Sequence, residues 1–176
     1  YHVLAPDFRI LQHSVCRNSL SDNTISCIAE DPFNNNLWIG TSEGLNVMDK
    51  RTGEIKKYKA PSISNNVVSA LCVTRDNTLW VGTDNGLCRY VPEKDTFVVC
   101  GDEFGDGRLR YVTIKSLLED SDGDLWIGTW AQGLFRYSPS TDKVVVYPKI
   151  NEQYSSHVIY EDSNKDIWVG SWGYGL

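Results

Sequence analysis

The sequence predicts an all-β fold, a β-propeller fragment of about three and a half four-stranded blades from a ring of seven. One signature recurs four times in the 176 residues, at steps of 42, 46 and 42. Each full copy carries four short strand patterns, and a repeat of roughly 40 to 50 residues with four strands is that of a propeller blade. The composition includes 6 Trp, 9 Tyr, 5 Phe and 14 Gly. Aromatic residues punctuated by Gly, Asn and Asp are typical of short strands and tight turns.

The signature is a strand centred on tryptophan. Its four copies read LWIGTSEGL (37–45), LWVGTDNGL (79–87), LWIGTWAQGL (125–134) and IWVGSWGYGL (167–176). The tryptophans share one register, so we expect Trp38, Trp80, Trp126 and Trp168 all to be buried between neighbouring blades. The glycine two residues after each tryptophan allows close approach of a neighbouring backbone.

Three further strand patterns accompany the tryptophan strand. The first strands are TISCIAED (24–31), VVSALCVT (67–74), TIKSLLED (113–120) and SHVIYED (156–162). The third strands are LNVMD (45–49), LCRYVP (87–92) and LFRYSP (134–139). The fourth strands are IKKY (55–58), FVVC (97–100) and VVVY (144–147). Turns rich in Asn, Asp and Gly separate the strands, so each repeat is predicted to be an antiparallel meander.

These patterns divide the chain into five parts. Residues 1–18 form an N-terminal segment with a lone outer strand, DFRILQHS (7–14). Blade 1 covers 19–60, blade 2 with a long connection covers 61–108, blade 3 covers 109–148, and a partial blade 4 covers 149–176. Because three and a half blades cannot close a ring, we expect the remaining blades in the rest of a larger parent protein.

Charge and cysteine spacing exclude several classes of protein. The chain has 17 Lys and Arg against 23 Asp and Glu, a net charge of −6, which argues against a nucleic-acid groove. It has no apolar run of the roughly 20 residues needed to span a bilayer. The five cysteines contain no CxxC pair, so zinc and thioredoxin-like sites have little support. We expect buried free thiols.

The fragment is not expected to be an enzyme. It has no GxxxxGK[ST] nucleotide loop, its three histidines lie in no phosphoacceptor context, and no Ser-His-Asp or Cys-His set can be assembled. The segment DSDGD (120–124) has the alternating carboxylates of a calcium loop. PFNNN and RDNT occupy the same register in other repeats, which favours an Asp-Gly hairpin turn. We therefore predict no catalytic residue, no metal site and no cofactor.

The candidate ligand-binding residues lie where the repeats differ. One face gathers the turns that follow the tryptophan strands and the connections between blades. The candidates there are Trp130, Gln132, Trp172, Tyr174, Arg110 and Tyr111. Exposed tryptophans beside polar groups are typical of carbohydrate recognition, although the two tryptophans packing on each other between blades is an alternative. His157 is added because it shares a register with Ser26, Ser69 and Lys115, a set that lines a central channel or forms a solvated inner edge.

The third repeat resembles the two-component regulator propeller repeat, whose pattern runs roughly N-x-V-x-x-I-x-E-D-x-x-G-x-LWIGT-x-x-GL-x-RYD-P. The second repeat departs from it with Val73-Thr74 in place of Glu-Asp, and the fourth has Ser171 in place of Thr. The matching residues of the third repeat are Ile114, Leu117, Glu119, Asp120, Gly123, Leu125 to Thr129, Gly133, Leu134, Arg136, Tyr137 and Pro139.

The resemblance implies an extracytoplasmic sensor module of a two-component histidine kinase, usually of the hybrid kind, as in gut bacteria of the Bacteroides type. Such a module is the periplasmic part of an inner-membrane protein. It detects a ligand such as a glycan fragment and controls transcription through a phosphorelay. The residues leave two alternatives open, a free-standing carbohydrate-binding propeller and a propeller lyase or hydrolase.

The predicted partners follow from the same description. A glycan-type small ligand and the remaining blades of the parent chain are the first two. The open blade edges at both ends also favour association of two copies, which predicts a homodimer.

Overall fold

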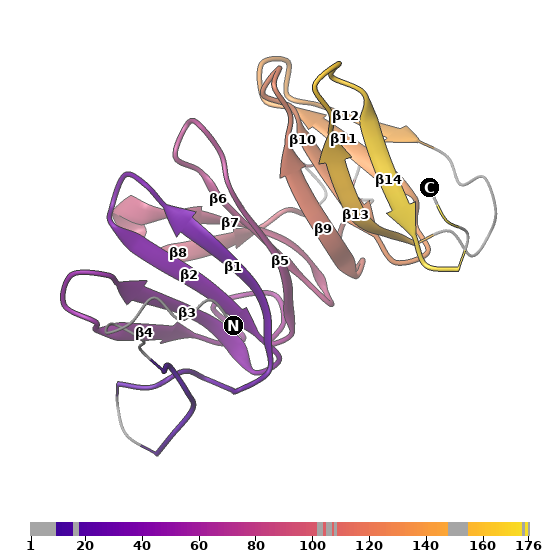
Figure 1. Ribbon diagram of the computed structural model, residues 1–176. Coiled ribbons are helices and arrows are strands. Elements are labelled where there is room, and N and C mark those ends of the chain that lie inside the picture. The colour runs from indigo at the N-terminus through magenta and orange to yellow at the C-terminus, as the bar shows by residue number, and fades with distance from the viewer. Residues whose placement is uncertain are drawn as a thin grey trace.

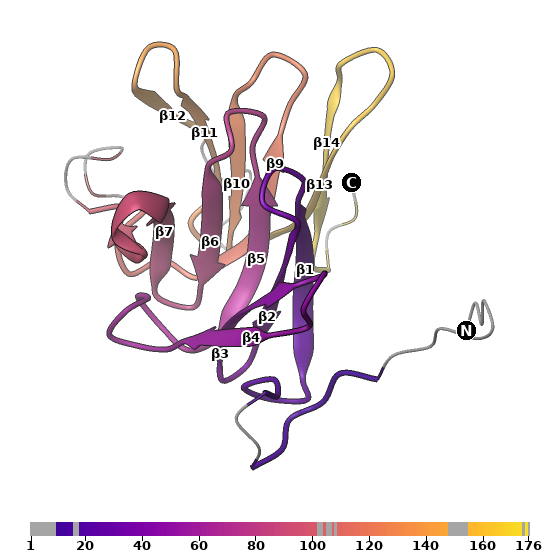
Figure 2. The ribbon, with the colours of Figure 1, turned by 90° about the vertical axis from the view of Figure 1, so that its left-hand side faces the viewer.

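The structure is a computed structural model that describes residues 10–15, 18–101, 104, 107, 109–147, 155–173 and 175. Its strands form separate antiparallel sheets, three with four strands and one with two (Figure 1). The sheets follow one another along the chain, and β1, β5, β9 and β13, the first strand of each sheet, lie side by side (Figure 2). The predicted all-β propeller fragment of about three and a half blades is confirmed.

The strand bounds agree with the repeat. Blade 1 consists of β1 (Ile25–Asp31), β2 (Asn36–Thr41), β3 (Gly44–Asp49) and β4 (Ile55–Tyr58). Blade 2 consists of β5 (Val68–Val73), β6 (Leu79–Thr83), β7 (Gly86–Val91) and β8 (Thr96–Val99), with a 3₁₀ turn, η1 (Pro92–Lys94), between the last two strands. Blade 3 consists of β9 (Ile114–Glu119), β10 (Leu125–Thr129), β11 (Leu134–Ser138) and β12 (Lys143–Tyr147). Blade 4 has β13 (Ser156–Glu161) and β14 (Ile167–Ser171).

The N-terminal segment is only partly described. Residues 7–9 of the expected lone strand lie outside the described residues, and residues 10–14 form no strand. Their one bridge joins His13 to Leu20, and the backbone N–H of His13 donates to the side chain of Asn23. Residues 10–14 therefore pair with the start of blade 1, while the Asn18 side chain accepts a hydrogen bond from the backbone N–H of Ile55 in the edge strand β4, at 2.7 Å.

The strand tryptophans of blades 1 and 2 pack against the following blade. Trp38 contacts Tyr90 of blade 2 at a ring-centroid distance of 5.2 Å, and Trp80 contacts Tyr137 of blade 3 at 5.7 Å. Trp38, Trp80 and Trp126 are buried as expected. The expectation was wrong for Trp168, which is 48% exposed. Trp168 lies in the last described sheet, so no following blade covers its indole.

The glycine of each signature lies against an inner strand. A Cβ on Gly82 would come within 2.6 Å of the Ile114 side chain, and a Cβ on Gly40 within 2.7 Å of the Val68 side chain. Both contacts are made to the inner strand of the next blade. Glycine is therefore needed here because two sheets approach closely, in agreement with the sequence prediction.

The register shared by Ser26, Ser69, Lys115 and His157 is a β-bulge. In every blade the pairing of the first two strands skips this one residue. The Ser26 hydroxyl donates to the carbonyl of Val68, and the Ser69 hydroxyl donates to the carbonyl of Ile114 at 2.5 Å. In blades 1 and 2 the bulged residue thus joins neighbouring inner strands, and in blades 3 and 4 it carries a longer side chain.

The DSDGD segment forms a hairpin turn around one carboxylate. Asp120 accepts hydrogen bonds from the backbone N–H groups of Asp122 at 3.0 Å and Asp124 at 2.9 Å, and from the Trp126 indole at 2.7 Å. The carboxylate is therefore used by its own turn and strand. The described part of the chain contains no group of side chains arranged to hold a metal ion.

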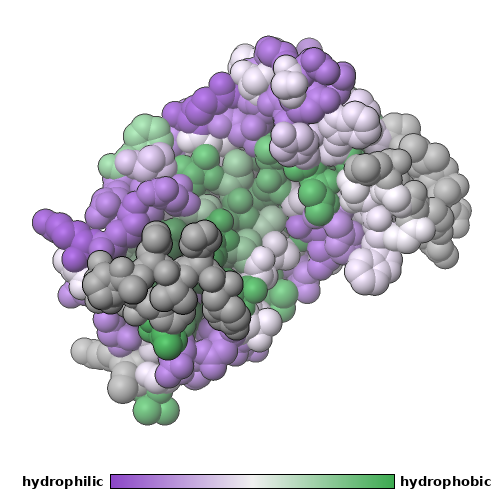
Figure 3. All heavy atoms as spheres, in the orientation of Figure 1, coloured by the Kyte–Doolittle hydropathy of each residue, from purple (hydrophilic) through white to green (hydrophobic). Residues whose placement is uncertain are grey.

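Hydrophobic residues gather in the middle of the face shown in Figure 3, with hydrophilic residues around them. The described cysteines, Cys27, Cys72, Cys88 and Cys100, are free thiols, while Cys16 lies outside the described residues. Over the described ranges, no helix has the length and apolarity required to cross a membrane.

Candidate functional site

The turn after each tryptophan strand is closed by a hydroxyl. Thr41 and Thr83 donate to the glycine carbonyl three residues later, at 2.8 and 2.9 Å. Thr129 and Ser171 donate to a carbonyl four residues later, at 2.6 and 3.1 Å. In blades 3 and 4 the turn is one residue longer, and the residue after the hydroxyl is a tryptophan, Trp130 or Trp172.

The structure brings these two tryptophans together around His157. The ring centroid of His157 lies 5.5 Å from that of Trp130, in an edge-to-face arrangement, and 5.7 Å from that of Trp172. Trp130 is 47% exposed and Trp172 is 69% exposed, whereas His157 is half-buried. We call these three residues the tryptophan–histidine cluster. The β-bulge at His157 in β13 places the imidazole beside the tryptophans of the two longer turns.

Two polar atoms in and beside the cluster have no hydrogen-bond partner. They are Nε2 of His157 and the hydroxyl of the buried Ser156. Buried polar atoms are nearly always paired, so the unpaired Nε2 of the half-buried His157 is a candidate for pairing with a bound molecule, whereas Ser156 is 0% exposed.

A cation and a carboxylate border the cluster. Nζ of Lys115 lies 5.8 Å from the ring centroid of Trp130 and 3.4 Å from the Asp84 carboxylate. Lys115 shares the bulge register of His157, and Asp84 follows Thr83 as Trp130 follows Thr129. The repeat register predicts Lys115 beside His157 but does not include Asp84, whose position immediately after the turn hydroxyl is the signal that identifies it.

The other candidate residues have separate positions. Arg110 and Tyr111 form a pair beside the Gly86 turn, with the guanidinium 4.9 Å from the tyrosine ring centroid. Tyr111 is 68% exposed and has a positive φ of 62°. Gln132 is exposed in the same turn as Trp130, and Tyr174 lies outside the described residues.

The cluster is suited to binding a polar molecule with an apolar face. Indole rings stack on the C–H faces of sugars and similar rings, while an imidazole, an ammonium group and a carboxylate can pair with hydroxyl groups. Two exposed aromatic side chains from different blades can contact one ligand together.

The chain matches known proteins over most of its length. The family profile described as two component regulator propeller matches residues 19–43, 62–85, 108–131 and 150–173. The extracellular domain of a hybrid two-component system from B. thetaiotaomicron is 28% identical with a TM-score of 0.74, over 85% of this chain and 20% of that chain.

Two further relatives are more distant or match a shorter segment. A second such extracellular domain from B. thetaiotaomicron is 24% identical with a TM-score of 0.74, over 91% of this chain and 23% of that one, and this similarity concerns the fold. Histidine kinase P4 of Formosa agariphila is 31% identical over 82 residues, which are 44% of this chain and 6% of that protein. The chain thus spans about a fifth of the solved relatives. The family profile covers more than half of the chain, and the chain therefore belongs to the two-component regulator propeller family.

Proposed function

We propose that this chain is part of the extracytoplasmic sensor region of a two-component histidine kinase of the hybrid kind. In this proposal the parent protein is anchored in the inner membrane, and the propeller lies in the periplasm. Ligand binding is relayed across the membrane to a phosphorelay that controls transcription. Membership of the family supports the proposal, as does the similarity to extracellular domains of hybrid two-component systems.

The ligand in this proposal is a glycan fragment bound at the tryptophan–histidine cluster. The observation that carries it is the pair of half-exposed to exposed tryptophans, which two lengthened turns hold against His157. A sugar ring stacks on the indoles, and its hydroxyl groups pair with the imidazole Nε2 and the Lys115 ammonium. Gln132 and the Arg110–Tyr111 pair border the same face and extend the surface for longer fragments.

The test combines binding with signalling. Xylo-, gluco- and galacturono-oligosaccharides are titrated into the 176-residue chain by calorimetry, and any ligand found is then applied to cells carrying the full-length sensor. Replacing Trp130 and Trp172 by Ala should weaken binding about tenfold, or about 1.4 kcal/mol, because two stacking surfaces are lost. The transcriptional response should weaken accordingly.

Trp168→Ala is the matched control for this experiment. Trp168 is as exposed as Trp130, at 48%, but it belongs to the strand register rather than to the cluster. Its replacement should leave oligosaccharide binding by the 176-residue chain unchanged. A folded Trp130→Ala/Trp172→Ala protein with a normal response would refute the assignment of the ligand to this face, and turnover of the oligosaccharides by the chain would favour an enzyme instead.

A further inference from the structure

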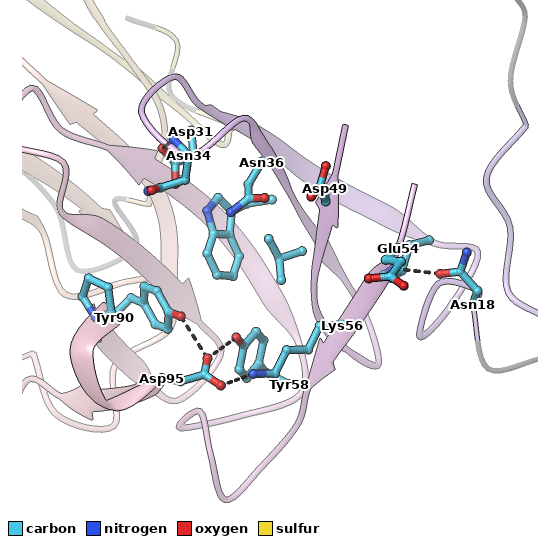
Figure 4. A pocket seen from close by; sticks show the side chains of 14 residues that line it. Asn18, Asp31, Asn34, Asn36, Asp49, Glu54, Lys56, Tyr58, Tyr90 and Asp95 are labelled. Carbon is cyan, nitrogen blue, oxygen red and sulfur yellow. Dashed lines mark hydrogen bonds and ion pairs between the residues drawn. The ribbon is translucent and has the colours of Figure 1, made fainter. Parts of the chain in front are cut away.

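A cleft of about 770 Å³ lies between blades 1 and 2, at the outer rim (Figure 4). We call it the blade 1–2 cleft. Blade 1 supplies one wall, with Trp38, Val47 and Tyr58, and blade 2 supplies the other, with Tyr90 and Asp95. The turns that border it join the first to the second strand and the third to the fourth. It therefore opens at the opposite end of the blades from the tryptophan–histidine cluster.

Trp38 differs from Trp126 and Trp168 in the partner of its indole N–H. In blades 3 and 4 this group donates to Asp120 at 2.7 Å and to Asp162 at 2.8 Å, each six residues earlier in the chain. In blade 1 the corresponding Asp31 is seven residues before Trp38, because the turn is one residue longer.

In the longer turn, the Asp31 carboxylate accepts hydrogen bonds from residues of the turn itself. Asp31 accepts hydrogen bonds from the backbone N–H groups of Phe33 and Asn34, both at 3.0 Å, and from the Asn34 amide at 2.8 Å. Trp38 is 2% exposed, lines the cleft, and its Nε1 has no hydrogen-bond partner. A buried donor without a partner costs about 1–3 kcal/mol, so an acceptor bound here is favoured.

Blade 1 also lacks the arginine that pairs with the strand tryptophan in blades 2 and 3. Residue 47 pairs across the strands with Trp38, just as Arg89 pairs with Trp80 and Arg136 with Trp126. The Arg136 guanidinium lies 5.7 Å from the Trp126 ring centroid and 3.5 Å from the Asp124 carboxylate. Val47 is shorter and uncharged, and the cleft beside it is larger than the 440 Å³ cleft between blades 2 and 3.

Negative charge dominates the lining. The cleft is bordered by four carboxylates and one ammonium group, and these are Asp31, Asp49, Glu54, Asp95 and Lys56. Asp95 accepts hydrogen bonds from the hydroxyls of Tyr58 at 2.6 Å and Tyr90 at 2.9 Å, and it also pairs with Lys56. These bonds, led by the one from Lys56, hold the pKa of Asp95 at about 2, so it is charged at neutral pH.

We propose that the blade 1–2 cleft binds a small organic cation that also carries hydroxyl groups, of the amino-sugar class. The ammonium group is attracted by the excess of carboxylates. A hydroxyl oxygen accepts from the Trp38 indole, and the C–H face of the ring packs on the aromatic walls. This site shares no residue with the tryptophan–histidine cluster, so it is independent of the sensor function proposed above.

Glucosamine is the probe, and glucose is its neutral match of nearly equal shape. In calorimetric titrations of the 176-residue chain, glucosamine should bind at least about tenfold more tightly than glucose, which corresponds to about 1.4 kcal/mol. Raising the salt concentration should reduce this difference, because it rests on charge. Equal affinity for the two sugars, or no heat of binding at millimolar ligand, would overturn the proposal.

Two variants and one control locate the bound molecule. Val47→Arg restores the arginine of the other blades and should abolish glucosamine binding. Trp38→Phe keeps a ring but removes the N–H, and should weaken binding at least about threefold for one lost hydrogen bond. Val145→Arg places the same new side chain on an exposed strand position of β12, outside the cleft, and should bind glucosamine normally. Circular dichroism checks folding, and unchanged binding by a folded Val47→Arg protein would contradict this location.

Discussion

Burial controls the chemistry of the described thiols. Desolvation raises the pKa of Cys27 and Cys72 to about 11 and that of Cys100 to about 12, from an ordinary value near 9. The same cause raises the pKa of Cys88. The thiolate is the reactive form, so these side chains behave as small hydrophobic residues rather than as nucleophiles.

The thiols should therefore resist alkylation while the chain is folded. At about pH 8, iodoacetamide should label Cys27, Cys72, Cys88 and Cys100 slowly in the native chain and rapidly in urea, since unfolding restores the ordinary thiolate fraction. Peptide mass spectrometry reads out each site. Fast labelling of Cys100 in the native chain would contradict the burial of its thiol.

The same shifts predict alkaline lability. A thiol whose pKa is raised in the folded state contributes its full stabilisation below the unfolded-state pKa near 9. This contribution is lost as the pH rises from there through the folded-state pKa values of about 11 and about 12. The free energy of unfolding, measured by urea denaturation, should consequently fall over this range. Replacing Cys100 by Ala should remove its part of the fall, and an identical pH profile in that variant would contradict the assignment.

Residue-level features were predictable only in part. The repeat register correctly placed Trp38, Trp80 and Trp126 in the core, because their environments are set by strand pairing. It missed the exposure of Trp168, which depends on a neighbouring blade, and the unpartnered indole N–H of Trp38. That feature arises because a turn one residue longer redirects the Asp31 carboxylate, a geometric effect that residue types alone do not show.

At the scale of elements, the second strand of a blade packs closely against the inner strand of the next blade through its glycine. A Cβ on Gly82 would lie 2.6 Å from Ile114, in the next inner strand, whereas a Cβ on Gly170 of β14 would lie 3.6 Å from its nearest neighbour, Val158. The same sequence position is thus crowded in blade 2 and roomy in blade 4.

Alanine substitution should separate these two glycines. Gly82→Ala should lower the free energy of unfolding by about 1–3 kcal/mol, as overpacking of a close contact does. Gly170→Ala should change it by less than about 0.5 kcal/mol, since the new methyl group meets only ordinary van der Waals distances. Urea denaturation of both variants is the measurement, and equal losses would indicate that β14 is packed more closely than the structure shows.

Strand positions were predicted well because alternation and turn chemistry act locally. The fourth strand IKKY (55–58) coincides with β4, and the first strand VVSALCVT (67–74) contains β5. The tryptophan–histidine cluster was predictable as a face but not as a contact, because its assembly depends on a β-bulge that aims His157 between two turns. The blade 1–2 cleft was not predicted, since it depends on which side chains pair across the strands and on the path of one turn.

At the scale of the whole molecule, both end sheets leave an apolar face uncovered. The side chains concerned are Ile28 in β1, which is 60% exposed, and Val158, Tyr160 and Trp168 in blade 4, which are 48–63% exposed. Exposed apolar patches and open sheet edges favour association.

The isolated chain should consequently form dimers. Light scattering at micromolar concentrations should give twice the mass of the 19.9 kDa chain. Trp168→Glu places a charge on the uncovered face of blade 4 and should shift the equilibrium toward monomer, whereas Trp172→Glu, on the tryptophan–histidine cluster, should not. A monomeric unmodified chain would show that the uncovered faces do not associate.

The bulged serines have a mechanical consequence for the whole fragment. Ser26 and Ser69 tie neighbouring blades together at their inner strands, through bonds to main-chain carbonyls. At the rim, blades 1 and 2 are tied by the half-exposed ion pair of Lys56 and Asp95, which salt screens. The blades are therefore joined by hydrogen bonds at their inner strands and by a salt-sensitive ion pair at the rim. A small rotation of one blade relative to its neighbour displaces the rim more than the inner strands. A molecule bound in the blade 1–2 cleft is therefore well placed to change the angle between blades 1 and 2.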